Sequence, residues 1–109
     1  MNIMNTIIKR VKIGNSYTKY SIRRSNFYLI RWEPNSSSGI HDHNNKKCDF
    51  ILLNGILQEV RYEKPHMGGI YSVNNIYPFI KNTMYPEDGY HEMFNHDDCV
   101  KYSIHRYYD

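Results

Sequence analysis

A chain of 109 residues is long enough for one small domain with a modest core, but too short for two. Its hydrophobic fraction of 40% and aromatic fraction of 15%, with eleven tyrosines, exclude a disordered polar chain and favour a strand-rich fold. The net charge of +3 is only mildly basic. Because the basic clusters are widely spaced, we interpret them as solvated surface charge and expect no nucleic-acid partner.

The two cysteines, Cys48 and Cys99, are fewer than the disulfide framework typical of small secreted domains, although a bond between them stays open. The sequence has no apolar leader and no run long enough to span a bilayer. It therefore predicts a cytoplasmic protein with no membrane partner, and we expect a monomer.

The sequence predicts the secondary structure of the first third of the chain with unequal clarity. Residues 1–12 carry apolar residues at spacings that fit either a helix or a strand, so their type stays open. Residues 27–32 have strand composition. The Pro-, Ser- and Gly-rich segment 34–39 predicts a loop that leads into a strand beginning at His41.

The middle of the chain contains the best hairpin signal. Residues 49–53 and 56–62 flank Asn54-Gly55, a dipeptide that readily takes the positive φ values of a type I′ turn. A second strand pair is expected within residues 69–80, with Asn74-Asn75 at its turn.

The last strand is expected over residues 100–107, after a loop at 82–89. Alternation places one polar row on a single face of this strand, and its members are Lys101, Ser103, His105 and Tyr107. A polar row on a strand needs a reason, so we expect it to face the interior of an all-β barrel that contains a site.

Alternation along a strand also places His41 and His43 on one face, so their two imidazoles can converge on a single metal ion. His91 supplies a third imidazole near Gly89 and Asn95. Three neutral imidazoles suit a first-row divalent ion and leave other coordination positions open. A His-x-His pair alone is more often structural, so this interpretation depends on the neighbouring motifs.

Together these motifs resemble the cupin superfamily and, within it, the type I cysteine dioxygenases. In that family a cysteine follows the His-x-His pair where most cupins carry a glutamate. The matching residues are His41, His43, Cys48, His91, Ser103, His105 and Tyr107. The resemblance runs from Tyr17 to Tyr107. It implies a single cupin-type β-barrel, or jelly roll, over residues 1–109, with little helix beyond a possible short N-terminal one and with both ends shorter than in the family.

The resemblance also implies a chemistry. His41, His43 and His91 would bind one mononuclear Fe(II), and Cys48 and Tyr107 would form the family's thioether crosslink beside it. His105 and Ser103 would position Tyr107. The implied reaction is that of a dioxygenase, which adds both atoms of O2 to the sulfur of L-cysteine and gives cysteine sulfinate.

The expected substrate-binding segment departs from the family in one residue. The family holds the substrate carboxylate with an arginine in Tyr-x-Arg, whereas this chain has Tyr17-Thr18-Lys19. Lysine keeps the charge but lacks the bidentate fork. Two alternatives therefore stay open: a dioxygenase of another small thiol, such as cysteamine or a mercapto-acid, and a metal-binding cupin without turnover. We interpret Arg31, His66 and His96 as surface residues, and Cys99 as a packing residue.

Overall fold

The computed structural model describes residues 8–13, 16–39, 46–62, 69–85 and 89–108. The first two expected metal ligands, His41 and His43, lie outside these ranges, as does His66. Every regular element within the ranges is a β-strand. The strands are β1 (Ile8–Ile13), β2 (Tyr17–Ile22), β3 (Phe27–Trp32), β4 (Ser36–Ser37), β5 (Lys47–Leu52), β6 (Leu57–Tyr62), β7 (Ile70–Ile76), β8 (Asn82–Met84), β9 (Tyr90–Asn95) and β10 (Lys101–Tyr108).

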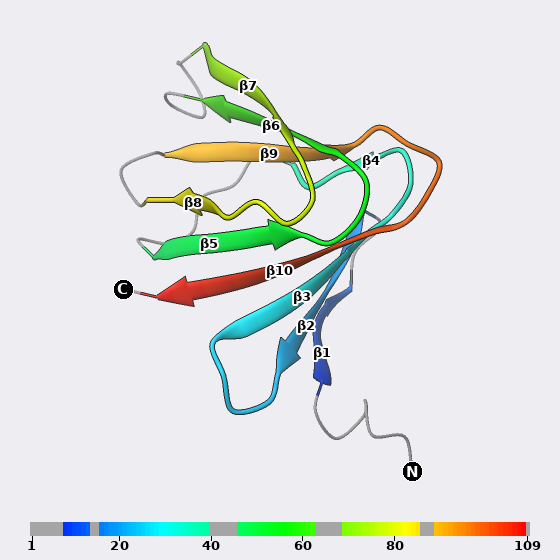
Figure 1. The fold of residues 1–109 in the computed structure, drawn as a ribbon, viewed down its shortest axis with the longest axis vertical. Helices are drawn as coiled ribbons and strands as arrows, with labels where there is room; N and C mark the ends of the chain where they lie inside the picture. The colour runs from blue at the N-terminus through cyan, green and yellow to red at the C-terminus, as the bar shows by residue number, and fades with distance from the viewer. Residues whose placement is uncertain (1–7, 14–15, 40–45, 63–68, 86–88, 109) are drawn as a thin grey trace.

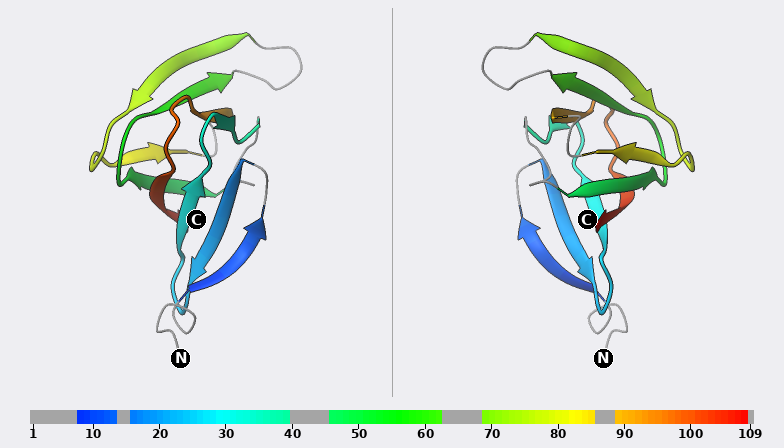
Figure 2. Two further views of the ribbon diagram at one scale, coloured as in Figure 1. Left: turned by 90° about the vertical axis from the view of Figure 1, so that its right-hand side faces the viewer. Right: turned by 90° about the vertical axis from the view of Figure 1, so that its left-hand side faces the viewer.

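These strands form two antiparallel sheets that face each other (Figures 1 and 2). The larger sheet has the order β1-β2-β3-β10-β5-β8, and the smaller has the order β4-β9-β6-β7. No ladder joins the two sheets among the described residues, so the barrel is a jelly roll that is not strictly closed. The expectation of an all-β fold is confirmed. No helix that could cross a membrane occurs in the part of the chain that the structure describes.

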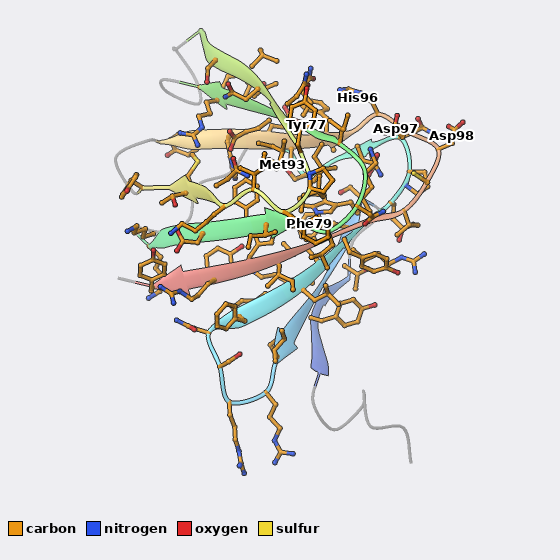
Figure 3. All side chains as sticks on the ribbon, in the orientation of Figure 1. Tyr77, Phe79, Met93, His96, Asp97 and Asp98 are labelled. Atoms are coloured by element: carbon orange, nitrogen blue, oxygen red, sulfur yellow. The ribbon has the colours of Figure 1, made fainter. Side chains whose placement is uncertain are left out.

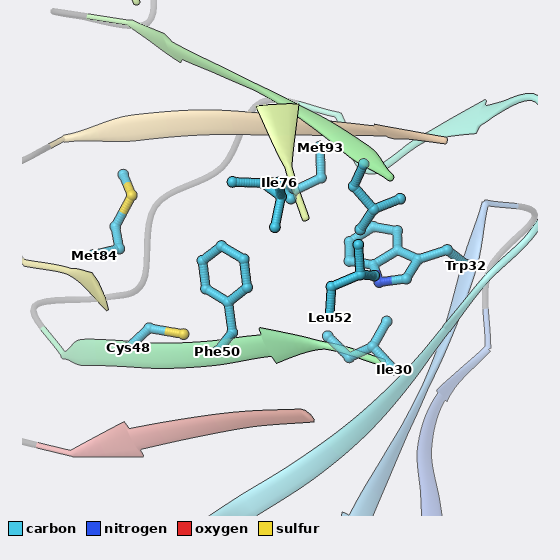
Figure 4. Packing of buried hydrophobic residues seen from close by; sticks show 9 residues of the cluster. Ile30, Trp32, Cys48, Phe50, Leu52, Ile76, Met84 and Met93 are labelled. Carbon is cyan, nitrogen blue, oxygen red and sulfur yellow. The ribbon is translucent and has the colours of Figure 1, made fainter. Parts of the chain in front are cut away.

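The core lies between the two sheets, where side chains alternate along each strand. On β5 the inward residues Cys48, Phe50 and Leu52 are buried, while the residues between them are partly exposed. Met93 from the smaller sheet and Trp32 from the larger one complete the layer (Figure 4). Burial of apolar area of this kind is the main source of stability for a small domain.

The N-terminal segment whose type stayed open is extended where it is described. Residues Ile8–Ile13 form β1 and pair with β2, with a register shift between Arg10 and Lys12. The possible N-terminal helix is therefore not formed by these residues.

The predicted hairpin at Asn54-Gly55 is wrong, because β5 and β6 belong to different sheets. The connection carries the chain from one sheet to the other. The Asn54 side chain binds the strand across from it: its Oδ1 accepts from Tyr102 N at 2.8 Å, and its Nδ2 donates to Val100 O at 3.0 Å. Only Gly55, with φ of +71°, takes the left-handed conformation that the dipeptide suggested.

The predicted turn at Asn74-Asn75 is also wrong, because both residues lie inside the continuous strand β7. They pair with Glu59 and Gln58 of β6. The strand β7 is the edge of the smaller sheet, and both asparagines are exposed there. Polar, turn-favouring side chains are tolerated on an edge strand because they stay in water. The expected loop at 82–89 is likewise shortened by β8, which pairs with β5.

Candidate functional site

The polar row of β10 faces the interior, as the alternation predicts. Lys101 and Ser103 are fully buried and His105 is 5% exposed, whereas the residues between them are partly exposed. Lys101 binds Asp97 and the carbonyl of Ile56. The central strand β10 pairs with β3 and β5, which places Ser103 beside Ile30 and Leu52, His105 beside Tyr28 and Phe50, and Tyr107 beside Cys48.

Cys48 and Tyr107 are direct cross-strand neighbours whose side chains share a hydrogen bond. Burial raises the pKa of the Cys48 thiol to about 12. Burial and the adjacent thiol raise the pKa of the Tyr107 phenol well above its ordinary value. The cause in both cases is that a desolvated site disfavours the charged form. Both groups are therefore neutral at physiological pH.

A chain of hydrogen bonds runs from Cys48 through His105 and Ser103 to Trp32. The Trp32 indole N–H donates to Ser103 Oγ at 2.8 Å, and Ser103 Oγ lies 2.7 Å from His105 Nε2. The Ser103 oxygen accepts from the indole, which can only donate. The other ring nitrogen of His105, Nδ1, is 3.7 Å from Cys48 Sγ. The role of Trp32 was missed from the sequence, where it appeared only as part of a strand.

Lys19 reaches this group from β2. Its ammonium lies over the Tyr107 ring, 4.2 Å from the centroid, and over the Tyr28 ring, 4.5 Å from the centroid. Tyr17 is on the same face of β2 and packs on Trp32, with 5.3 Å between ring centroids. A cation held by ring faces keeps part of its charge available to an anion. The structure thus brings the expected substrate-binding residues to the Cys48 and Tyr107 pair.

His91 lies on the facing sheet, in β9, and is 3% exposed. Its Nδ1 is 2.8 Å from Glu59 Oε2, while Glu59 Oε1 accepts from Arg61 Nε at 2.9 Å. Burial disfavours the Glu59 carboxylate, but the hydrogen bonds and charges of His91 and Arg61 outweigh this and hold its pKa below the ordinary value. Glu59 was missed from the sequence, although alternation from the buried Leu57 could have placed it on the inner face of its strand.

The residues present suit a metal ion at His91. Metal-binding histidines usually donate an N–H of their second ring nitrogen to a carboxylate or carbonyl, and the Glu59 carboxylate lies 2.8 Å from His91 Nδ1. The described residues contain no cluster of three or more ligand-type side chains around one point. The expected partners His41 and His43 lie outside those residues, so the complete ligand set stays a prediction.

Several other residues lie apart from this group. Arg31 is on the outer face of β3 and pairs with Glu33 at 2.9 Å, so it is a surface residue as expected. His96 is exposed beside Asp97 and Asp98, near the β9–β10 connection (Figure 3). Cys99 is exposed rather than packed, and Cys48 and Cys99 form no disulfide, which resolves the question left open by the sequence.

Several solved structures share this fold. AerE from Microcystis aeruginosa matches with a TM-score of 0.74 at 12% identity, over 94% of this chain and 46% of AerE, so the chain spans about half its length. CENP-C from Drosophila melanogaster matches with a TM-score of 0.71 at 9% identity, over 92% of this chain and 79% of that one.

A sugar phosphate isomerase of the cupin superfamily from Silicibacter pomeroyi matches with a TM-score of 0.67 at 18% identity, over all of this chain and 76% of that one. At such identities these likenesses establish a cupin fold and nothing about activity. The family model for cysteine dioxygenase type I matches residues 10–109, nearly the whole chain. With the cupin fold and the inward row of β10, this match shows that the chain belongs to the cysteine dioxygenase type I family.

Proposed function

We propose that this protein is an Fe(II)-dependent thiol dioxygenase that converts L-cysteine and O2 to cysteine sulfinate. Its family supports the coarser statement of a metal-using dioxygenase that acts on a thiol. The observation that carries the proposal is the pairing of Cys48 with Tyr107 inside the jelly roll, with His105 behind them and Lys19 over the phenol ring. The reaction adds both oxygen atoms to the thiol, so it needs no external reductant.

In this proposal the iron is held by His41, His43 and His91. When bound, the metal brings the thiol sulfur and O2 together at one centre. The larger sheet supplies the buried Cys48 thiol and the Tyr107 phenol, with the Lys19 ammonium over the phenol ring. There the Tyr107 phenol is kept protonated by burial and donates a hydrogen bond toward the reacting groups. His105 and Ser103 hold the hydrogen-bond chain behind Cys48, beside the phenol.

The same pair is proposed to form a thioether bond between Cys48 and Tyr107. Forming the carbon–sulfur bond breaks the S–H bond of Cys48 and one ring C–H bond of Tyr107, and the two hydrogen atoms and two electrons would pass to one O2, which leaves as hydrogen peroxide. Adjacent positions on antiparallel strands bring Cβ atoms to about 4.5–5.5 Å, close enough for a sulfur to reach a tyrosine ring. Intact-protein mass spectrometry after turnover should show the loss of two hydrogen atoms, and the Tyr107→Phe variant should not.

Lys19 is proposed to bind the substrate carboxylate through its ammonium. Because a lysine offers a point charge rather than a fork, its removal should weaken binding more than it slows the chemical step. We expect Lys19→Met to raise KM for L-cysteine by about tenfold, from the loss of one charge-assisted hydrogen bond, and to leave KM for cysteamine nearly unchanged. Equal effects on both thiols would contradict this role.

The decisive assay is oxygen uptake by the Fe(II)-loaded protein with L-cysteine, with sulfinate detected by mass spectrometry. Coupled uptake and sulfinate formation support the proposal. If L-cysteine is inert and cysteamine or a mercapto-acid is oxidised, the substrate assignment is wrong and the reaction class is right. Iron binding without any uptake across the three thiols would instead favour a metal-binding cupin without turnover.

A further inference from the structure

We infer that Glu59 is a positioning residue that fixes the proton of His91 on Nδ1 and so presents the Nε2 lone pair to the metal. The inference rests on the proposed function, because it takes His91 as a ligand. It adds to that function a partly buried ion pair on β6, formed by Glu59 and Arg61, which determines the ring nitrogen of His91 that faces the metal.

Each oxygen of the Glu59 carboxylate has its own hydrogen-bond partner. Oε2 lies 2.8 Å from His91 Nδ1, and Oε1 accepts from Arg61 Nε at 2.9 Å. Glu59 is 1% exposed and His91 is 3% exposed, so water does not compete for these contacts. Arg61 also donates to the Thr83 carbonyl of the facing sheet at 3.5 Å, which anchors the guanidinium on its other side.

The proton position follows from this arrangement. A guanidinium only donates and keeps the carboxylate anionic, so Glu59 can only accept from His91. A histidine that binds a metal ion is neutral and has a single N–H, which for His91 must therefore be the Nδ1–H. The Nε2 nitrogen then carries the lone pair that a divalent metal needs.

The Glu59→Gln variant tests this position of the His91 proton. An amide offers one acceptor and one donor in place of two acceptors. The charged Arg61 N–H takes the amide oxygen, which directs the amide N–H toward His91. Nδ1 must then accept, and the proton moves to Nε2. We expect the variant to bind metal about 10–100-fold more weakly, the cost usually seen when such a supporting partner of a ligand is lost.

A second variant separates proton placement from loss of charge or packing. In the double variant Glu59→Gln with Arg61→Met, no guanidinium claims the amide oxygen, so it can turn to His91 and accept from Nδ1–H. Relative to Arg61→Met alone, we expect the metal affinity of this double variant to fall by less than about tenfold. A role of Glu59 that was only structural or only electrostatic gives no such recovery.

The matched control is Glu92→Gln. Glu92 is the next residue to His91 on β9, and its carboxylate accepts from Tyr62 and Ser37 instead. The same chemical change there should leave metal affinity within about threefold, as for a surface substitution.

The experiment has two readouts on the full chain. The first is the affinity of the metal-free protein for Co(II) and Fe(II), followed by titration. The second is the tautomer of His91 in the metal-free protein, read from nitrogen-15 NMR, which assigns the ring nitrogen that carries hydrogen. The Nδ1–H form in the wild type and the Nε2–H form in Glu59→Gln support the inference.

The failures of the two proposals are distinguishable. Wild-type affinity in Glu59→Gln, or an Nε2–H tautomer in the wild type, overturns the role of Glu59. If His91→Ala binds metal as tightly as the wild type, the proposed metal site is wrong, whatever the tautomer of His91.

Discussion

Cys48 illustrates how a side chain takes its chemistry from its surroundings. A thiol on a strand is ordinarily a small apolar core residue, and this one does pack with Phe50 and Met84 in the core cluster. Its contacts with His105 and Tyr107 give it a polar side as well. Burial then keeps the thiol protonated, which suits a group that would give up a hydrogen atom in the proposed crosslinking rather than one that attacks as a thiolate.

The two cysteines of this chain provide a direct test of that protonation. Because burial raises the pKa of Cys48 to about 12, its thiolate fraction is very small at about pH 8, and its sulfur is also inaccessible. We expect iodoacetamide to alkylate the exposed Cys99 in the folded, metal-free protein and to leave Cys48 unmodified. Peptide mass spectrometry gives the modified position.

Unfolding in urea supplies the control, since Cys48 should then react at a rate similar to that of Cys99. Rapid modification of Cys48 in the folded protein would show that the site between the sheets is open to reagents.

At this scale the sequence identifies the residues whose spacing forms a motif, and misses those that support them. The row Ser103, His105 and Tyr107 is readable because alternation on one strand is a local property. The partners Trp32 and Glu59 lie on other strands, so their roles depend on which strands become neighbours. A single sequence does not fix that pairing.

At the scale of elements, the Asn54-Gly55 connection decides how the two halves of the site meet. It ends β5, which carries Cys48, and begins β6, which carries Glu59, in the other sheet. Had it formed a hairpin, both residues would lie in one sheet and His91 would not face Tyr107 across the interior. The left-handed Gly55 and the buried Lys101 side chain packed against it hold this crossing in place.

Alanine substitutions at three glycines test how strongly the crossing depends on Gly55, with Gly39 and Gly69 as comparisons. An alanine Cβ at Gly55 would lie 2.6 Å from Lys101 Cε and would also need φ of +71°. At Gly39 φ is +75°, and no atom of the described residues would lie within 4 Å of the added Cβ. Gly69 has no positive φ, and there too no atom of the described part of the chain would lie that close. We expect Gly69→Ala to change the free energy of unfolding by less than about 0.5 kcal/mol, Gly39→Ala to cost about 1 kcal/mol and Gly55→Ala to cost more than about 2 kcal/mol.

Urea denaturation of the three variants measures these values. Equal losses at Gly39 and Gly55 would show that the Lys101 side chain moves aside at no cost and that only backbone conformation matters.

For the molecule as a whole, the site lies between two sheets that share no ladder in the described residues. His91 projects from the smaller sheet, and Cys48 and Tyr107 lie on the larger one. A metal held by His91 would add binding energy to the folded state alone, since the unfolded chain does not hold the ligands together.

We therefore expect Fe(II) or Co(II) to raise the thermal midpoint of the wild type. At metal concentrations about 100 times Kd the gain is about 2.7 kcal/mol, or roughly 11–22 °C for a domain of this size. His91→Ala should lose this shift. His96→Ala changes an exposed histidine that follows His91 closely in the sequence, and this variant should keep the metal-induced shift. Calorimetry with and without metal gives both midpoints, and an equal shift in all three proteins would place the metal elsewhere.

The sequence by itself determined the all-β class, the family resemblance and the inward polar row of β10, because composition, motif spacing and alternation are local properties of the chain. Tertiary structure alone decided that Asn54-Gly55 crosses between sheets and that Asn74-Asn75 stays within an edge strand. It also decided that Glu59 and Trp32 support the candidate ligands and donors. The physical reason is that turn-forming residues specify a backbone conformation but not which strands pair, and strand pairing is settled by burying one common core.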